Sequence, residues 1–310
     1  MLNILNFKLD FKTIFGIFIS LIGLIWAFQD FKFNEFIIAF KKAKFFYIAL
    51  ACISIISSVW LRAIRWNLLI KSDKVTTNNL FDIEMVGYFG NNVLPIRAGE
   101  VYRTLLLSNK TGLSKSYCFG TIVLERIMDL VGLFIFFGIL TVFYPIPKDI
   151  KSWMNLVVLI LFLFIFLFFI FNKFFKIGKY IKFNFLKQFF SVFTDIKLES
   201  SIYILFWTII IWFIYWLDTH LIQYAFQLNM SWQQTMLVLV LTSLTMAVPS
   251  APGAIGTFHA AVKFTMVSLL GFSADISNSY SIILHAYSYI TLTIIGAYYF
   301  INSIKKEKLI

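Results

Sequence analysis

The feature that most constrains the fold is an apolar run without any charged residue, WMNLVVLILFLFIFLFFIF, from Trp153 to Phe171. A helix needs about 20 apolar residues to cross a hydrocarbon core about 30 Å thick, so this run has the length of a membrane span. Similar blocks recur along the chain near 13–28, 45–61, 119–144, 201–226 and 281–302. A single buried core helix of a soluble protein does not explain this recurrence. The sequence predicts an all-α, polytopic integral membrane protein.

Composition and charge agree with this fold class. Of all residues 60% are hydrophobic and 14% are charged, whereas soluble domains have about 25% charged residues. The formal charge of +12 is explained by lysine-rich cytoplasmic loops and anionic lipid surfaces, so nucleic acid is not expected as a partner. Asp10 and the absence of a small-residue cleavage site predict that the first apolar block is retained.

Two apolar stretches are interrupted by residues that break helices. The 80–94 block runs into Asn91, Asn92 and Pro95. The 233–248 and 254–270 blocks are joined by VPSAPGAIG, which holds the helix-breaking residues Pro249, Pro252, Gly253 and Gly256. Unpaired backbone at membrane depth is tolerated only where protein buries it or water reaches it. We expect two broken or re-entrant segments and about six to eight membrane helices.

Lysine positions predict the topology. Six lysines in 172–198, and Lys305, Lys306 and Lys308 in the C-terminal tail, place both segments in the cytoplasm. We therefore expect a single transmembrane domain, 1–310, whose halves, about 1–172 and 199–310, are joined by the basic segment 173–198 and form a possible inverted repeat. Segment 172–198 is equally well an interfacial helix or a basic loop. Segment 30–44, with four lysines, conflicts with a cytoplasmic N-terminus unless it is an amphipathic helix on the surface.

Two groups of arginines lie at the ends of apolar blocks, where charge is costly unless it is paired or hydrated. Arg62 and Arg65, in LRAIRWNLL, share one helical face; for this pair alone the favoured interpretation is that they are anchors reaching to the interface. In GNNVLPIRAGEVYR, helix breakers precede arginines suited to binding phosphate in a bidentate manner, which favours an anion site over a plain polar loop. Its candidate residues are Asn92, Arg97, Glu100 and Arg103.

Two further groups lie in the later helices. In TIVLERIMDLVGLF, Glu125 and Asp129 share a face next to Arg126 and require positive partners, which the four arginines above supply. A structural ion-pair cluster is as plausible here as a role in binding substrate. The second proline and glycine break is followed by Thr257, His259 and Lys263, with His259 and Lys263 on one face, whereas His285, Asp218 and His220 are weaker candidates.

No nucleotide-binding or hydrolase motif is present, and neither a cofactor nor a metal is expected. Cys52 and Cys118 are interpreted as packing residues. Carboxylates at Glu100, Glu125 and Asp129 leave open a lipid-modifying transferase that holds a metal-bound pyrophosphate donor, although a DxD pattern is absent.

The segments LRAIRWNLL, GNNVLPIRAGEVYRTLLL, TIVLERIMDLVGLF and VPSAPGAIGTFHAA together resemble the lysylphosphatidylglycerol synthase transmembrane region, a flippase-like family, from about Lys44 to Gly296. The positions that match the family's motifs are Arg62, Arg65, Asn92, Pro95, Arg97, Gly99, Glu100, Arg103, Glu125, Arg126, Asp129, Pro249, Pro252, Gly253 and Gly256. In the second break Thr257-Phe258-His259 stands where an acidic residue commonly follows the glycines, so the resemblance does not assign the substrate.

The resemblance implies a multi-pass protein of the inner membrane that handles lipids, as the best-understood members move an aminoacylated phospholipid between leaflets. The aminoacyl-transferase domain of bifunctional members is not expected, since the chain stops at Ile310. We expect a lipid flippase or transporter with an anionic or lipid-phosphate headgroup as its ligand and a possible homo-oligomeric state. A membrane transferase and an accessory lipid-binding subunit are the alternatives.

These expectations give each charged group a role. Arg97 and Arg103 are expected to engage the headgroup while Glu100, Glu125 and Asp129 hold them in place. The two breaks are expected to meet from opposite sides of the bilayer at corresponding positions of the two halves and to enclose a polar cavity near the midplane. Simple packing kinks are the alternative.

Overall fold

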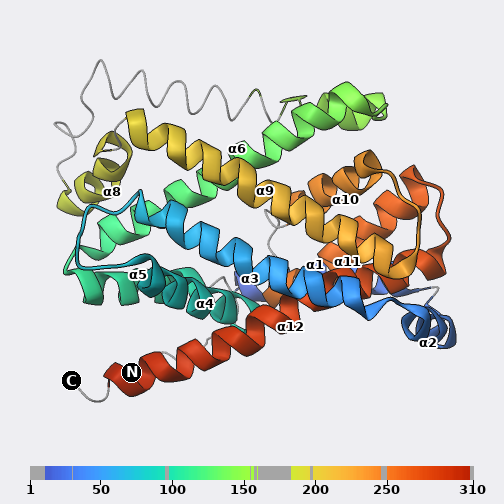
Figure 1. Cartoon of the computed structure of the whole chain (residues 1–310), viewed down its shortest axis with the longest axis horizontal. Helices are drawn as coiled ribbons and strands as arrows, with labels where there is room; N and C mark the ends of the chain where they lie inside the picture. The colour runs from blue at the N-terminus through green and yellow to red at the C-terminus, as the bar shows by residue number, and fades with distance from the viewer. Residues whose placement is uncertain are drawn as a thin grey trace. The chain divides into compact units, whose positions relative to one another are not determined.

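The computed structural model describes residues 11–29, 31–94, 98–153, 155–156, 159, 183–195, 198–245 and 250–307, and every regular element among them is a helix (Figure 1). The longer helices are α1 (Phe11–Phe28), α3 (Phe45–Asn67), α4 (Thr77–Val93), α6 (Lys115–Phe143), α9 (Leu198–Phe226) and α12 (Ala274–Glu307). The shorter elements are α2 (Phe33–Lys42), α5 (Ala98–Thr111), α8 (Asn184–Asp195), α10 (Trp232–Thr245), the 3₁₀ turn η4 (Pro252–Ala254), α11 (Thr257–Lys263) and the π-helical stretch η5 (Phe264–Leu269). The predicted all-α fold is confirmed.

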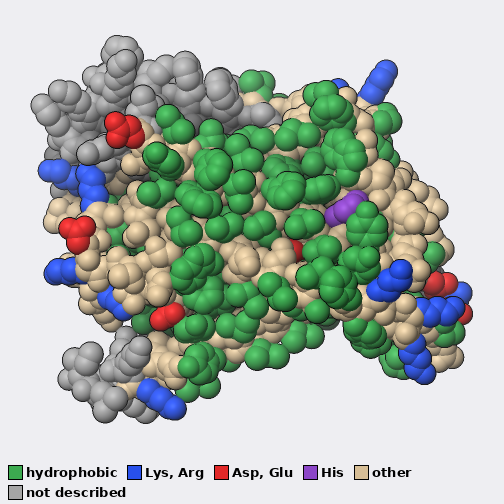
Figure 2. Space-filling view, in the orientation of Figure 1, with side chains coloured by type: hydrophobic (Ala, Val, Ile, Leu, Met, Phe, Trp, Pro, Cys, Tyr) green, Lys and Arg blue, Asp and Glu red, His purple; other side chains and the backbone are tan. Residues whose placement is uncertain are grey.

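Four of the described helices are long and apolar enough to cross a membrane: Phe45–Asn67, Lys115–Phe143, Glu199–Phe226 and Ala274–Lys305. Their outward faces are apolar, as lipid requires. On α9 an exposed stripe with helical spacing comprises Ile202, Phe206, Ile209 and Phe213. Figure 2 shows hydrophobic side chains over much of the face in view. The polytopic class is confirmed, the total of six to eight spans stays a prediction, and most of the run Trp153–Phe171 lies outside the described residues.

The chain divides into two compact units, each assembled from separate stretches of sequence. The first unit comprises Met1–Val59, Asp82–Tyr102 and Ile214–Ile310, and the second comprises Trp60–Phe81 and Arg103–Phe213. The division does not follow the expected halves, because α3, α4, α5 and α9 each contribute residues to both units. The single transmembrane domain, its two halves and the inverted repeat stay predictions.

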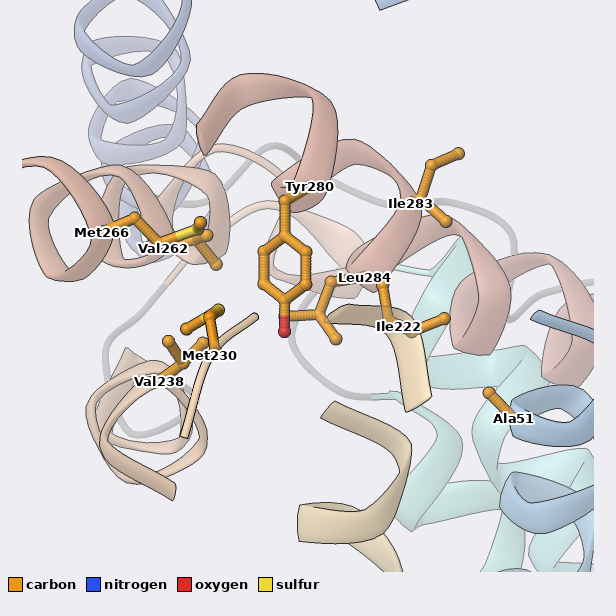
Figure 3. Close-up of a cluster of buried hydrophobic side chains, with 9 residues drawn as sticks. All are labelled: Ala51, Ile222, Met230, Val238, Val262, Met266, Tyr280, Ile283 and Leu284. Carbon is orange, nitrogen blue, oxygen red and sulfur yellow. The ribbon is translucent and has the colours of Figure 1, made fainter. Parts of the chain in front are cut away.

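The apolar core of the first unit surrounds Tyr280 of α12. Figure 3 shows its ring pointing from α12 toward Met230, Val238 and Val262. All nine side chains of this cluster are buried, and Phe36 and Phe40 of α2 pack against it from outside. The core therefore joins α2, α3, α9, α10, α11 and α12 within one unit.

Each of the two ambiguous lysine-rich segments contains a helix among its described residues, α2 in 30–44 and α8 in 172–198. Helix α2 has no buried residue and ends on Lys41 and Lys42, while Lys32 just before it forms an ion pair of 3.2 Å with Asp275. These features fit the amphipathic surface helix that was one alternative for 30–44. In the second unit α8 packs on α6, where a Cβ at Gly120 would lie 2.8 Å from the carbonyl oxygen of Phe189. Residues 184–195 are thus a docked helix, and 172–182 lie outside the described residues.

Candidate functional site

The second unit holds an arginine–carboxylate cluster, which consists of Arg62 and Arg65 of α3, Arg103 of α5, and Glu125, Arg126 and Asp129 of α6. Both Glu125 and Asp129 are shared between arginines. Nη2 of Arg103 lies 2.6 Å from Oε2 of Glu125, and Arg62 pairs with Oε1 of the same carboxylate. Asp129 lies 2.6 Å from Nη2 of Arg65 and 3.0 Å from Nη1 of Arg62. Ion pairs therefore link the three helices α3, α5 and α6.

Burial shows that these arginines are not interfacial anchors. The side chains of Arg62, Arg65 and Arg103 are 2%, 0% and 1% exposed, and that of Glu125 is 0% exposed. An arginine that reaches the interface keeps its guanidinium in water. The favoured interpretation of Arg62 and Arg65 as snorkelling anchors is therefore wrong in this structure, because two carboxylates one turn apart on α6 draw both guanidinium groups inward.

Two uncharged side chains complete the cluster. The Trp66 ring lies under the guanidinium of Arg103, with Cζ 4.2 Å from the ring centroid, and its Nε1 donates to Oγ1 of Thr121 at 3.0 Å. Thr208 of α9 accepts from Nη1 of Arg65 at 3.1 Å. The sequence reasoning missed Thr208, since a threonine ten residues into an apolar helix gives no signal of its charged partner.

Arg126 and Asp129 form the accessible edge of the cluster. The Arg126 side chain is 36% exposed and that of Asp129 is 18% exposed. Their ion pair, at i and i+3, measures 3.3 Å. Arg126 is therefore the arginine of the cluster that solvent reaches, whereas Arg103 is enclosed by Glu125 and Trp66.

The first interruption lies in the first unit, where α4 ends at Val93 and α5 begins at Ala98. The chain passes so close to itself here that only glycine fits. A Cβ at Gly90 would lie 2.7 Å from Cα of Gly99, and one at Gly99 would collide with the carbonyl oxygen of Gly87. The start of α5 is therefore pressed against the last turns of α4. Pro95 and Arg97 lie outside the described residues, and Glu100 is half-buried.

The second interruption depends on glycine conformation. After α10, Pro252 opens the turn η4, and the backbone then passes through φ of +67° at Gly253 and +96° at Gly256, which side chains rarely tolerate. Gly256 precedes α11, and its N–H donates to Nδ1 of His259 at 3.4 Å. The predicted break is present, while Pro249 lies outside the described residues.

Both interruptions contact one tyrosine of α12. The Tyr289 hydroxyl donates to the carbonyl oxygen of Asn92 at 3.1 Å, and Nδ2 of Asn92 donates to Oγ1 of Thr293 at 2.9 Å. The Tyr289 ring lies directly against Gly253, where a Cβ would be 2.8 Å from the ring's Cδ2. His285, one turn earlier on α12, contacts the carbonyl oxygen of Gly253 through Nε2 at 2.8 Å. We call this meeting of the two breaks on α12 the break junction.

Aromatic rings line the second break next to the break junction. The rings of His259 and His285 lie edge to face with centroids 4.9 Å apart, and Phe258 stacks on His285 at 5.0 Å. Phe28 of α1 contacts His259 at 5.2 Å. Both imidazoles are buried, with 7% and 9% exposure. His285, ranked low from the sequence, is thus a structural partner of the second break.

Removing the Tyr289 hydroxyl should weaken the break junction. In Tyr289→Phe the carbonyl oxygen of Asn92 loses its donor, so we expect the free energy of unfolding to fall by about 1 kcal/mol. Thermal unfolding in detergent measures this change. Tyr298→Phe is the matched control, because Tyr298 lies on the same helix with 63% exposure; equal stability of the two variants would contradict the assigned contact.

Apart from Glu100, the candidate residues that the structure describes fall into two places. The arginine–carboxylate cluster gathers Arg62, Arg65, Arg103, Glu125, Arg126 and Asp129, whereas the break junction and its surroundings gather Asn92, Pro252, Gly253, Gly256 and His259. Tyr289 and Thr293 were missed. They follow His285 at intervals of four, so a polar stripe along an apolar helix was the available signal.

The helices, the apolar exterior and the buried charges define an α-helical integral membrane protein. The family described as the lysylphosphatidylglycerol synthase transmembrane region matches residues 13–296. The chain belongs to this family, a membrane domain associated with lipid handling.

Two relatives, both named UPF0104 membrane proteins, come from Methanocaldococcus jannaschii. The first is 33% identical over 117 residues, which cover 36% of this chain and 34% of the relative. The second is 27% identical over 221 residues, which cover 68% of this chain and 93% of the relative. No solved structure shows a significant match.

Proposed function

We propose that this protein moves a lipid between the leaflets of the inner membrane, the lipid being a phospholipid, an aminoacyl-lipid or a polyprenyl-linked lipid. The observation that carries the proposal is the break junction. Interrupted membrane segments that converge are a common way to build a transport site, because unwound backbone supplies polar groups where lipid would otherwise forbid them. Membership of a lipid-handling family supports the same proposed function.

Helix lengths support re-entrant segments at both breaks. At 1.5 Å per residue, α10 with 14 residues and α5 with 14 residues each extend about 21 Å. The hydrocarbon core measures about 30 Å, so neither helix reaches across it. The 34 residues of α12 extend about 51 Å. A segment that enters the membrane and turns back is expected to consist of short helices that flank a break. Such a segment packs against a long helix that crosses the membrane.

The position of Tyr289 along α12 supports a site at membrane depth. The membrane-span candidate Ala274–Lys305 has its centre close to Tyr289. If this span crosses the bilayer, the contacts of Tyr289 with Asn92 and Gly253 lie near the midplane. Approach of the two breaks from opposite sides of the membrane, with a cavity between them, is part of the proposal.

The arginine–carboxylate cluster supports an anionic headgroup as the ligand. Arginine binds phosphate in a bidentate manner through its planar guanidinium group. Glu125 and Asp129 fix the orientations of three such groups, those of Arg62, Arg65 and Arg103. Arg126 is the accessible member and makes the first contact in the proposal. Arg103 acts with it after the cluster opens. Contact of Arg97 with the headgroup stays a prediction from the sequence, because Arg97 lies outside the described residues.

Reconstitution tests the function. The full chain is placed in phosphatidylglycerol and phosphatidylcholine vesicles that carry a trace of fluorescent phosphatidylglycerol, and the fluorescence accessible to a membrane-impermeant quencher is followed in time. Leaflet exchange of an unchanged lipid supports transport. A chemically modified lipid on chromatography replaces the proposal with a transferase, and neither result replaces it with an accessory role. Fluorescent lysylphosphatidylglycerol and a polyprenyl phosphate, assayed likewise, separate the lipid classes.

Replacing Arg126 tests the headgroup contact. A hydrogen bond to a charged group contributes about 1.5–3 kcal/mol, so Arg126→Ala should slow exchange of fluorescent phosphatidylglycerol about tenfold or more. Arg126→Lys should recover only part of the rate, because a point charge lacks the planar fork. Lys115→Ala, at an exposed residue on the same helix, is the control. An unchanged rate in Arg126→Ala and in an Arg97→Ala, Arg103→Ala double variant that inserts normally would end the headgroup assignment.

A further inference from the structure

The first unit contains a buried carboxylate outside both candidate sites. Asp218 lies on α9 inside a predicted membrane span, and its side chain is 0% exposed. Its neighbours are hydroxyl groups: Tyr287 of α12 donates to Oδ2 at 3.2 Å, and the Ser54 side chain of α3 lies beside the carboxylate. Oδ1 has no partner. Among the described residues, no lysine, arginine or histidine forms an ion pair with this carboxylate.

The surroundings of Asp218 favour its neutral form. An isolated carboxylate anion inside a membrane protein costs several kcal/mol or more, whereas the neutral acid costs far less. The titratable groups around this contact are phenols: Tyr287 of α12 donates to the carboxylate, and Tyr280 of α12 donates to the carbonyl oxygen of the adjacent Thr219. Tyr215 of the same helix as Asp218 lies near Tyr287. From α3 it meets Ser54. His220, two residues on, is directed elsewhere, since its Nδ1 lies 3.0 Å from Oγ1 of Thr235.

We propose that Asp218 is a proton-binding site within the membrane, and that loss of its proton is coupled through α12 to lipid movement. In this arrangement the proton sits on Oδ1, the oxygen without a partner, while Oδ2 accepts from Tyr287. Release of that proton to water leaves a carboxylate anion, which water or a cation must stabilise. Water reaches it only when α12 and α9 separate at the Tyr287 contact.

Helix α12 connects this site to the break junction. Tyr287 faces Asp218, and Tyr289, two residues on, contacts Asn92 and Gly253 from the opposite side of the helix. A shift of α12 that hydrates Asp218 therefore moves Tyr289 against both breaks. Proton release and opening of the lipid path become one event. The coupling rests on the proposed function, whereas proton binding at Asp218 does not.

Infrared spectroscopy of the purified full chain tests proton binding. We expect the carbonyl band of a protonated carboxyl group at neutral pH, its loss at alkaline pH, and its absence in Asp218→Asn. In Tyr287→Phe the band should persist to higher pH, because the hydroxyl that stabilises the anion is gone. Asp149→Asn, at an exposed carboxylate, and Tyr298→Phe, at an exposed tyrosine of α12, should leave the band unchanged. A band that is absent at neutral pH, or that never titrates, overturns the assignment.

Vesicles with a pH difference across the membrane test the coupling. We expect wild-type protein to redistribute fluorescent phosphatidylglycerol according to the gradient, and Asp218→Asn to lose this response. An equal response in both proteins overturns the coupling, and a response to a sodium gradient instead overturns the proton as the coupled ion. If wild-type protein exchanges no lipid under any condition, the proposed function and the coupling both fall, while the infrared result still decides proton binding.

Discussion

Glu125→Gln should be the most destabilising single substitution in the arginine–carboxylate cluster, lowering the free energy of unfolding by about 3–5 kcal/mol. Glu125 pairs with Arg62 and Arg103 and lies 3.7 Å from Arg65, and none of these side chains is more than 2% exposed. Glutamine keeps the shape but removes the charge, so buried guanidinium groups lose the anion that they share. We also expect lower expression.

Thermal unfolding in detergent and the yield of inserted protein measure this effect. The matched control is Glu199→Gln, because Glu199 is an exposed glutamate at the start of α9 in the same unit. A second variant, Asp129→Asn, should cost less, since Asp129 is 18% exposed and water can replace part of its role. Wild-type stability of Glu125→Gln would show that the cluster does not hold the helices together.

The fold class followed from the sequence because lipid imposes strict length and polarity requirements on every span. The interruptions were also predictable, since proline and glycine act on their own backbone at Gly253 and Gly256 whatever surrounds them. Periodicity does not encode which helix faces which. The two compact units therefore cut across α3, α4, α5 and α9 in a way that the apolar blocks did not reveal.

The site was predictable where charges demanded partners. Glu125 and Asp129, placed one turn apart in an apolar helix, required cations, and Arg62, Arg65 and Arg103 supply them. The direction of the arginine side chains was not predictable, because water at a helix end can hydrogen-bond to a guanidinium group as well as a carboxylate can. Tyr289 was missed because its role comes from contacts with Asn92 and Gly253, which are far away in the sequence.

Gly99→Ala should disrupt the first interruption and abolish most lipid exchange. The new methyl group would collide with the carbonyl oxygen of Gly87 and lie 2.8 Å from the backbone nitrogen of Asn91. Backbone cannot move aside as a side chain can, so α5 must shift away from α4. Overpacking of this kind costs about 1–3 kcal/mol. The shift also displaces Asn92, whose carbonyl oxygen and amide hold Tyr289 and Thr293.

Gly138→Ala is the matched control for this substitution. Gly138 is an exposed glycine in the middle of α6, and a Cβ there meets nothing within 4 Å. Alanine is favoured over glycine in a helix by about 1 kcal/mol, so this variant should be as stable as wild type or slightly more stable. We expect Gly99→Ala alone to lower both the unfolding temperature and the exchange rate in vesicles. If Gly99→Ala keeps full exchange, the close contact of α4 and α5 is dispensable and the first break has no part in the lipid path.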